Sequence, residues 1–334
     1  MKKLLIAMLV FVCATALFAN GQTEATATSE NIAAFPAGPI TLVCPWNPGA
    51  GADLICRMFE KLGPDYFGVP VVVENQNGAA GVTATLNFLN AKADGYSVLF
   101  DNGGVFTSKS LTGAASYSID DYQPLCGIVK DMNVLIANKK TTGISNMDEF
   151  LKAYSNTGKA LVVGCATGGI PHMCIAQLFK QANVTYKQVA YNGATEITAA
   201  LLGGHIDIAC IGASEISIVK DSSDVTVLAV FGEDVPQIAG LENAKSVFDY
   251  GYKIDTCVWR MLLVPKGTPQ DVYDVLYKGF TGMIQDPRFA EFAATNSLII
   301  DMKSPEEVTS SVKAELEDMR VVFQDLKLGI YADK

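Results

Sequence analysis

The segment Ile40–Arg57 reads ITLVCPWNPGAGADLICR, and three features follow one another in it. A β-branched apolar run ends at Pro45, a turn rich in proline and glycine comes next, and an apolar-periodic segment begins at Asp53. This order predicts a strand, a turn and a helix. Because the first N–H groups of a helix lie at its positive end, the turn is a candidate binding site for an anion. Trp46 would stand beside this site as an aromatic wall.

Short apolar runs alternate with amphipathic segments along almost the whole chain, which predicts an α/β protein with mainly parallel sheets flanked by helices. Each half has a strand, a glycine-rich turn and a helix, so two lobes that face one another in a clamshell are expected. The expected strands cover residues 40–45, 69–74, 97–101, 134–137, 161–164, 186–190, 206–211, 225–231 and 261–264. The expected helices cover residues 53–66, 81–92, 146–155, 194–202, 271–285 and 305–326, with another helix starting at 171.

The amino-terminal segment has the pattern of a secretory signal. Two lysines precede the apolar run Leu4–Phe18, and Ala19 supplies the small residue that a signal peptidase needs. We therefore expect a signal peptide over 1–19 and export to the periplasm. A flexible tether is expected over 20–34, whose polar composition offers little to bury. The residue before Cys13 matches a lipobox poorly, so no lipid anchor is expected.

Charge and cysteine content exclude several kinds of partner. The formal net charge of −10 becomes −12 without the two signal lysines, so we expect no nucleic-acid partner, whereas backbone dipoles can still bind a small anion. Seven cysteines follow Cys13, mostly in apolar runs. Small buried side chains are the favoured interpretation of them, and a disulfide is the alternative. Only His172 and His205 are available, without ligand spacing around them, so no metal and no cofactor are expected.

A second strand-to-helix turn lies in residues 164–172, which read GCATGGIPH. Gly168 and Gly169 permit close approach of the backbone to a ligand, and Thr167 adds a hydroxyl group. The turn would hold the opposite end of a carboxylate ligand, and an ordinary structural turn is the alternative. His172 falls in the first turn of the helix, where it is expected to pack or to cap.

A third turn, residues 191–196, reads YNGATE and again lies between a strand and a helix. Tyr191 would place its ring or hydroxyl on a ligand, and Gly193 and Ala194 would donate backbone N–H groups. Further along, Asp207 sits in an apolar run and needs a partner if it is buried. That partner is either a polar group of the ligand or a neighbouring turn, and the sequence leaves both possibilities open.

Catalytic arrangements are weak in this sequence. The segment around Ser214 lacks the second glycine of a nucleophile elbow, and neither histidine lies near a plausible nucleophile. No catalytic residue and no enzymatic activity are therefore expected. Asp53, at the head of the first predicted helix, is interpreted as its N-cap residue rather than as a ligand group.

Taken together, these motifs resemble the TctC-type (Bug family) extracytoplasmic solute receptors of tripartite tricarboxylate transport systems. The similarity runs from about residue 35 to the carboxyl terminus, and the order and spacing of its pieces make it specific. The pieces are Pro45-Trp46-Asn47-Pro48-Gly49 with Asp53 and Arg57, Val73-Glu74-Asn75, Gly78-Ala79-Ala80-Gly81, Asp94-Gly95-Tyr96, Tyr122-Gln123-Pro124-Leu125, Val189-Ala190-Tyr191-Asn192-Gly193, Leu201-Leu202-Gly203-Gly204-His205-Ile206-Asp207 and Pro265-Lys266-Gly267-Thr268-Pro269.

The resemblance implies a two-lobed periplasmic-binding-protein (Venus flytrap) architecture of a type II-like kind. Lobe 1 would comprise 35–138 plus 262–334, and lobe 2 would comprise 139–261. The implied function is capture of a small carboxylate, such as a di- or tricarboxylate or an acidic amino acid. The implied partners are the membrane permease subunits of a tripartite tricarboxylate transporter, with the protein itself a monomer. The alternatives are a receptor that presents a carboxylate to a sensor kinase, or an exported enzyme.

The resemblance also implies which residues contact the ligand. The loops Trp46–Gly51 and Thr167–Ile170 would hold the carboxylate ends, Tyr191–Ala194 would line the second lobe, and Asp207 would contact a non-carboxylate group. The full set of expected ligand-binding residues is Trp46, Asn47, Ala50, Gly51, Asn102, Thr167, Gly168, Gly169, Tyr191, Gly193, Ala194 and Asp207.

Three departures from the family pattern bear on this site. Gly49-Ala50 stands where a double glycine is usual, which changes the shape of the first loop. Asp101, at a strand end, would favour a ligand with an amine. Arg260 stands where a small or apolar residue is usual, and it either contacts a second carboxylate of the ligand or bridges surface acids.

Overall fold

One strand of 17 residues, β4 (Tyr122–Asn138), connects the two halves of the sheet. The computed structural model describes residues 35–165, 168–191, 194–325 and 327–332. Gly38–Lys334 forms one unit and Met1–Ala37 another, and the fold given below is that of Gly38–Lys334. The expected signal peptide and tether lie outside the described residues.

In the first half of the sheet, the parallel strands alternate with helices, as the sequence predicts. Strand β1 (Ile40–Cys44) pairs in parallel with β2 (Val71–Asn75) on one side and with β3 (Ser97–Asn102) on the other. Helices α2 (Gly51–Phe67) and α3 (Val82–Phe88) make the connections between these strands, and α4 (Gly103–Phe106) and α5 (Ser108–Leu111) follow β3.

The second half of the sheet repeats this organisation. Strand β5 (Ala160–Cys165) pairs in parallel with β6 (Thr185–Ala190) and with β7 (Ile208–Gly212), and β8 (Val225–Val230) pairs with β4. The helices of this half are α6 (Lys139–Thr142), α7 (Met147–Tyr154), α8 (Ile170–Gln181) and α9 (Ala194–Leu202).

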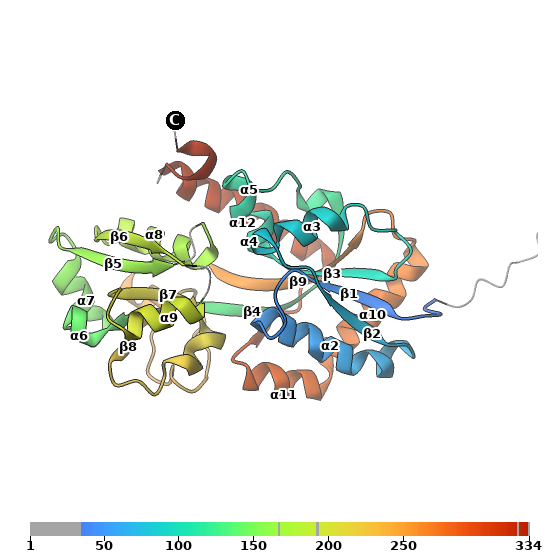
Figure 1. The fold of residues 1–334 in the computed structure, drawn as a ribbon, viewed down its shortest axis with the longest axis horizontal. Helices are drawn as coiled ribbons and strands as arrows, with labels where there is room; N and C mark the ends of the chain where they lie inside the picture. Colours follow the sequence, from blue (N-terminus) through green and yellow to red (C-terminus); the bar gives the residue numbers. More distant parts are fainter. Residues whose placement is uncertain (1–34, 166–167, 192–193, 326, 333–334) are drawn as a thin grey trace, which may run out of the picture. The chain divides into compact units, whose positions relative to one another are not determined.

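Two antiparallel strands, β4 and β9 (Cys257–Pro265), run between the halves, and we call them the crossing strands (Figure 1). Strand β9 pairs with β3, and the end of β4 pairs with β7, which gives the order β2-β1-β3-β9-β4-β7-β5-β6. The sheet is therefore mixed. Its parallel pairs come from the strand-helix-strand units, and its antiparallel pairs involve β4 or β9. This α/β arrangement, with helices flanking the sheet, confirms the expected fold class.

The carboxyl-terminal part consists mostly of helices that cover the sheet. Helix α10 (Gln270–Gln285) packs against α2, and α11 (Pro287–Thr295) packs against α10. Strand β10 (Ile299–Ile300) pairs with β4. Helix α12 (Pro305–Asp325) contacts β4, α4, α5 and α8, so it touches elements of both halves.

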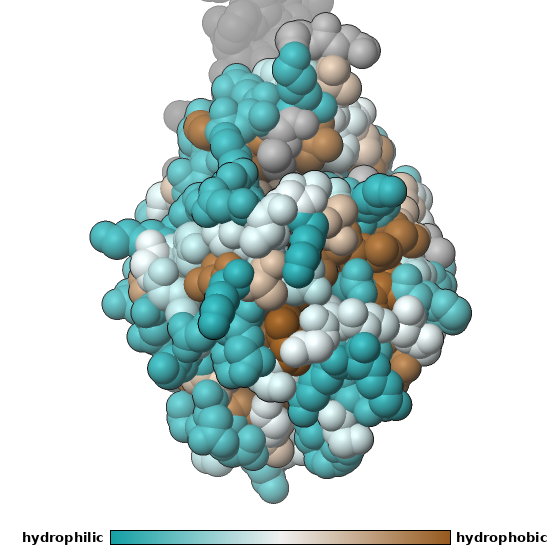
Figure 2. All heavy atoms as spheres, turned by 90° about the vertical axis from the view of Figure 1, so that its left-hand side faces the viewer, coloured by the Kyte–Doolittle hydropathy of each residue, from teal (hydrophilic) through white to brown (hydrophobic). Residues whose placement is uncertain are grey.

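The core forms because the amphipathic helices place their apolar residues on a buried face, which packs against the sheet or against other helices. In α2 this face includes Ile55, Phe59 and Leu62, all fully buried, and Phe59 stacks on Phe289 of α11. Figure 2 shows one end of the molecule, where hydrophilic spheres predominate and hydrophobic ones form small separate groups. Within the described residues, no helix has the length and apolar character needed to span a membrane.

The main differences from the expected elements concern buried strands and helix ends. Strand β4 begins at Tyr122 rather than 134, because polar residues such as Lys130 and Asp131 interrupt the apolar pattern that marks a strand. The structure also contains helix α11 and strand β10, which were not predicted from the sequence. The seven cysteines after Cys13 are free; six of them are buried, as expected of small buried side chains, and Cys257 is partly exposed.

Candidate functional site

The predicted ligand loops lie at the carboxyl ends of parallel strands in both halves. The loop 45–50 follows β1, and Asn102 ends β3 beside it. In the second half, Gly168 and Gly169 lie shortly after β5, and Tyr191 follows the adjacent strand β6. Carboxyl ends of parallel strands are where open α/β sheets bind ligands. We call these two sets of loops the first edge and the second edge.

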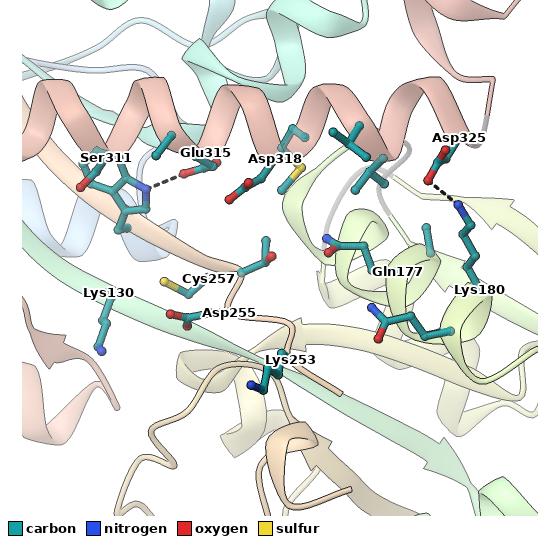
Figure 3. A pocket seen from close by; sticks show the side chains of 18 of the residues that line it. Lys130, Gln177, Lys180, Lys253, Asp255, Cys257, Ser311, Glu315, Asp318 and Asp325 are labelled. Carbon is teal, nitrogen blue, oxygen red and sulfur yellow. Dashed lines mark hydrogen bonds and ion pairs between the residues drawn. The ribbon is translucent and has the colours of Figure 1, made fainter. Parts of the chain in front are cut away.

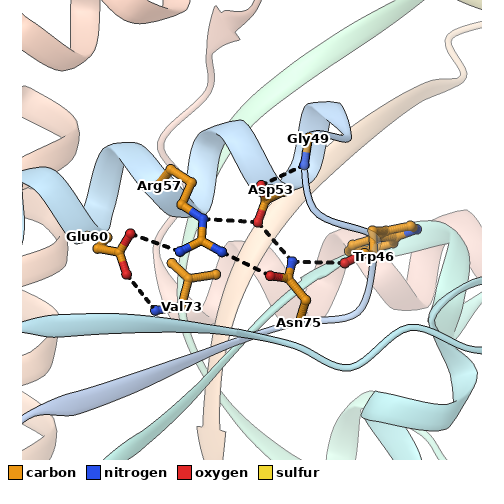
Figure 4. Close-up of polar contacts among 7 residues, drawn as sticks. All are labelled: Trp46, Gly49, Asp53, Arg57, Glu60, Val73 and Asn75. Atoms are coloured by element: carbon orange, nitrogen blue, oxygen red, sulfur yellow. Dashed lines mark hydrogen bonds and ion pairs between the residues drawn. The ribbon is translucent and has the colours of Figure 1, made fainter.

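The first edge is held in shape by a network of polar side chains (Figure 4). The Gly49 N–H donates to Asp53 Oδ2 at 2.8 Å, and Asn75 Nδ2 donates to Asp53 Oδ1 at 2.8 Å and to the Trp46 carbonyl at 2.9 Å. Arg57 Nη2 donates to Asn75 Oδ1 at 3.0 Å. These bonds connect the loop to α2 and β2, so its conformation is fixed before any ligand arrives.

Asp53 is not the N-cap residue of α2. The helix begins at Gly51, two residues earlier than expected, and Ala50 occupies the N-cap position without a side-chain bond. Burial alone would raise the pKa of Asp53, but the bonds from Gly49, Asn75 and Arg57 outweigh it and lower that pKa. Its carboxylate therefore stays charged near the positive end of the helix.

Three backbone donors at the start of α2 are available to a ligand. The first N–H that bonds within the helix region is that of Leu54, which donates to the Ala50 carbonyl at 3.0 Å. Among the bonds between described residues, none uses the N–H of Gly51, Ala52 or Asp53. Gly51 is exposed, and nothing lies within 4 Å of the position that a Cβ would take there. The Gly51 N–H is therefore a free donor beside open space, and the free N–H groups of the buried residues Ala52 and Asp53 lie directly behind it in the first turn.

Two other predicted residues of the first edge make local bonds. The Asn47 carbonyl accepts the Ala50 N–H at 3.1 Å, and the Asn47 side chain accepts a bond from Asn77 Nδ2. Asn102 Oδ1 accepts the Val105 N–H at 3.2 Å and so caps the short helix α4. These contacts give Asn47 and Asn102 structural roles at the edge where they were expected.

At the second edge, α8 begins at Ile170 with Gly169 as its N-cap residue. The Gly168 N–H donates to Nδ1 of the buried His172 at 3.1 Å, which confirms the interpretation of His172 as a packing and capping residue. Burial lowers the pKa of His172 to about 4, so the ring is neutral at physiological pH. Thr167 lies outside the described residues.

Tyr191 and Ala194 complete the described part of the second edge. The Tyr191 N–H donates to the Cys165 carbonyl at 3.2 Å, and a Cβ on Gly164 would lie 3.2 Å from Cε2 of the Tyr191 ring. Ala194 begins α9. Gly193 lies outside the described residues.

The elements that follow Asn102 of the first edge contact the second edge. A Cβ on Gly104 of α4 would lie 3.0 Å from Cγ1 of Ile170, the first residue of α8. A Cβ on Gly168 would likewise lie 3.0 Å from Cγ2 of Thr112, just after α5. The short helices α4 and α5, which follow Asn102 of the first edge, therefore lie against the start of α8 and Gly168 of the second edge.

Asp207 lies at neither of the two edges. It precedes β7 and lies beside the start of β5, at the amino ends of these parallel strands. Its Oδ2 accepts the Val162 N–H at 2.8 Å, and its own N–H donates to the Val162 carbonyl at 2.7 Å. Of the two partners left open by the sequence, the structure shows a neighbouring backbone segment.

The sequence left the role of Arg260 open. It lies on β9 opposite Asn102 of β3, with its Cζ 6.0 Å from the ring centroid of Trp46. Its Nε and Nη1 atoms are buried and have no hydrogen-bond partner. Among the described residues, no acid lies within ion-pair distance of it. The interpretation that Arg260 bridges surface acids is therefore wrong.

Three carboxyl groups lie around Arg260 at longer range. Asp131 accepts from the hydroxyl and the N–H of Ser214, and Glu215 accepts from the Gly212 N–H at 2.9 Å. Asp101 accepts from Thr85 Oγ1 at 2.6 Å and from the Asn102 N–H at 2.8 Å. Since Asp101 is fully buried and so bonded, it does not present its carboxylate to a ligand amine.

A cavity of about 910 Å³ lies elsewhere, between the crossing strands, α8 and α12 (Figure 3). Cys257 and Trp259, which alternate with Arg260 along β9, line it. Trp259 Nε1 donates to Glu315 at 2.7 Å, and Thr107 Oγ1 donates to the same carboxyl group at 2.8 Å. The cavity contains none of the expected ligand residues and is lined by both lysines and acids, so we do not assign it as the primary site.

The fold is the α/β architecture of periplasmic binding proteins. The chain belongs to the TctC family, because residues 55–328 match the family model described as Tripartite tricarboxylate transporter family receptor. Among the described residues, no group of three or more His, Cys, Asp or Glu side chains is placed to hold a metal ion.

Solved structures with the same fold include the periplasmic binding protein BugD. It is 25% identical with a TM-score of 0.74, over 88% of this chain and 99% of that one. MatC from Rhodopseudomonas palustris, with bound malate, is 19% identical with a TM-score of 0.73, over 86% and 99% of the chains. An R. palustris protein with adipate is 18% identical with a TM-score of 0.75, over 87% and 97%.

Proposed function

We propose that this receptor binds a small di- or tricarboxylate, or a related organic acid, and delivers it to the membrane permease subunits of a tripartite tricarboxylate transporter. The observation that carries the proposal is the set of free N–H groups at the start of α2, at the carboxyl-end edge of the sheet, where α4 and α5 follow Asn102 and lie against the start of α8 and Gly168. Helix starts of this kind bind carboxylates without needing a basic side chain. Malate in MatC and adipate in its R. palustris neighbour support this ligand class.

The proposed mechanism is closure of two lobes around the ligand. Lobe 1 comprises 35–138 plus 262–334, and lobe 2 comprises 139–261. Strand pairing supports this division, since β1, β2 and β3 associate with β9, whereas β5, β6 and β7 reach the rest of the sheet through the end of β4. A ligand that contacts both edges stabilises the closed arrangement by the contacts that exist only there.

The proposed setting is the periplasm, reached through a signal peptide over residues 1–19, where the receptor acts as a monomer and without catalysis. The proposed ligand contacts in the described residues are the backbone donors of Gly51, Ala52 and Asp53, the Trp46 ring, and the loops at Gly169 and Tyr191. Thr167 and Gly193 stay predictions from the sequence.

The test is a thermal-shift and calorimetric screen of protein that has been unfolded and refolded to remove bound ligand. Malate, adipate, citrate and acidic amino acids are compared with the uncharged amides of the same acids. An acid at about 100 times its dissociation constant should stabilise the protein by about 2.7 kcal/mol. Stabilisation by at least one acid, with none by its fully amidated form, supports the proposal. No stabilisation by any acid contradicts it.

A further inference from the structure

The guanidinium of Arg260 lacks the partners that a buried cation requires. Its Nε and Nη1 have no acceptor, yet the residue as a whole is partly accessible, so its accessible surface belongs to other atoms. Buried donors without partners destabilise a fold unless something else completes them. An arginine in this state, next to a ligand edge, is a candidate contact for an anion.

The acids of the chain do not complete this guanidinium. Asp101, Asp131 and Glu215 are near enough to interact with it electrostatically, but each already accepts hydrogen bonds from other groups. Burial lowers the pKa of Arg260, and these three carboxyl groups oppose that change. Burial also raises the pKa of Asp101 and of Glu215 to about 7, which weakens their negative charge near neutral pH. The positive charge therefore has only distant and partial compensation from the protein.

The surroundings of Arg260 fix where an anion would sit. The Trp46 ring belongs to the loop that leads into α2, and Asn102, opposite Arg260 on β3, ends at the same edge. Glu215 follows β7, at the carboxyl end of the second half. Arg260 thus lies between the carboxyl ends of the strands in both halves. A guanidinium binds a carboxylate through a planar pair of hydrogen bonds, which makes a carboxylate the matching occupant.

From this geometry we propose that Arg260 binds a second carboxylate of the ligand, while the free N–H groups of α2 bind the first. This inference rests on the proposed function and narrows it, because the receptor then selects acids with two or more carboxylates over mono-acids. The Trp46 ring contacts the same guanidinium by a cation–π interaction. Arg260 is therefore a specificity-determining residue, and the crossing strand that carries it is part of the binding site.

The test compares each di-acid with its own monoamide, which has nearly the same length and shape but one carboxylate fewer. Adipate with adipamate and succinate with succinamate are titrated calorimetrically into the wild type and into Arg260→Met. In the wild type, the better di-acid should bind about ten- to a hundredfold more tightly than its monoamide, as one charge-assisted pair implies. In Arg260→Met this ratio should fall to about twofold, because the di-acid loses far more affinity than its monoamide.

Two further variants keep the test decisive. Arg260→Lys retains the positive charge among the three acids but not the planar pair of donors, and should give an intermediate ratio. Arg320→Met is the matched control, because Nε of Arg320 is also buried without a partner but lies on α12, and its ratio should equal that of the wild type.

The outcomes separate the two proposals. If the wild type binds acids and Arg260→Met keeps the full ratio, the inference about Arg260 is overturned and the proposed function stands. If Arg260→Met and Arg260→Lys lose di-acid and monoamide binding equally, Arg260 has a structural role and the inference is again overturned. If the wild type binds no acid at all, the proposed function itself fails.

Discussion

The Arg260 guanidinium lies over the Trp46 ring, with 6.0 Å between Cζ and the ring centroid. This contact joins a crossing strand to the loop that leads into α2. The neighbouring residue on β9, Trp259, lines the cavity beside α12 and bonds to Glu315. The chain has two tryptophans. Trp259 lies on one face of β9, and Trp46 contacts Arg260, whose side chain points to the opposite face of the same strand.

Tryptophan fluorescence should therefore report the ligand from Trp46 and much less from Trp259. In Trp259→Phe, which retains Trp46, a bound acid should change the emission intensity or wavelength about as it does in the wild type. In Trp46→Phe the change should fall to a small fraction of that value. The measurement is a fluorescence titration with the best acid from the screen. An undiminished change in Trp46→Phe would place the ligand away from the first edge.

Removing the Asp53 carboxylate should destabilise the protein and loosen the first edge. Asp53→Ala leaves the Gly49 N–H and one Asn75 donor without their charged acceptor, which should lower the free energy of unfolding by about 1.5–3 kcal/mol per such bond at most. Urea unfolding at pH 7 measures this loss. Asp65→Ala, which removes only an exposed ion pair with Arg288, should cost less than about 1 kcal/mol.

The loss of stability in Asp53→Ala should depend on pH with a defined sign. The folded pKa of Asp53 is lowered, so its contribution to stability is present above the ordinary pKa of aspartate and is lost as the pH falls through the folded value. The difference in stability between the wild type and Asp53→Ala should thus shrink below about pH 4. A difference that stays constant into acid would contradict the role given to the carboxylate.

Much of the fold could be predicted from the sequence because its strands and helices are periodic. The strands β1, β5 and β7 and the helices α8, α9 and α10 lie close to their expected ranges. The crossing strands could not be predicted in full. They carry charged residues such as Asp131 and Arg260 inside the protein, and these interrupt the apolar pattern. The contacts of these residues, a hydrogen bond from Ser214 and a cation–π contact with Trp46, arise only in the tertiary structure.

The candidate site was predictable to the level of its loops, because glycine-rich turns between a strand and a helix have a recognisable sequence. The particular roles of Asp53 and Asp207 were not. Each accepts bonds from backbone N–H groups, and such partners leave no signature in the side-chain sequence. The position of Arg260 was visible as a departure from the family pattern, but its burial and missing partners depend on the packing of three separate segments.

Neutral His172 should make the protein less stable as the pH falls. Its pKa is about 4 in the folded protein against an ordinary value near 6.5, so the unfolded chain takes up a proton first. Stability is therefore lost between about pH 6.5 and pH 4, by roughly 3 kcal/mol at most from this residue. The buried acids Asp101 and Glu215, with pKa values raised to about 7, change stability in the opposite direction.

Variants isolate the histidine from these acids. In His172→Asn, the Asn Oδ1 can accept the Gly168 N–H as Nδ1 does, so the bond is kept and the titration is removed. The loss of stability from pH 6.5 to 4, measured by urea unfolding, should be smaller in His172→Asn than in the wild type. His205→Asn, at the exposed second histidine, is the control for replacing a histidine as such. Identical pH profiles for all three proteins would contradict the assignment.

Two glycines of α2 should separate ligand binding from stability. A Cβ on Gly51 would meet nothing within 4 Å, so Gly51→Ala should leave stability unchanged or raise it by about 0.4–1 kcal/mol. The added methyl group would occupy the space in front of the free N–H groups and should weaken acid binding at least severalfold. A Cβ on Gly63 would lie 2.4 Å from Cγ2 of Val71, so Gly63→Ala should lose about 1–3 kcal/mol. Acid affinity should stay at the wild-type value in the folded Gly63→Ala protein. Unfolding and calorimetry on the same samples check both expectations, and wild-type affinity in Gly51→Ala would show that the ligand does not approach the start of α2.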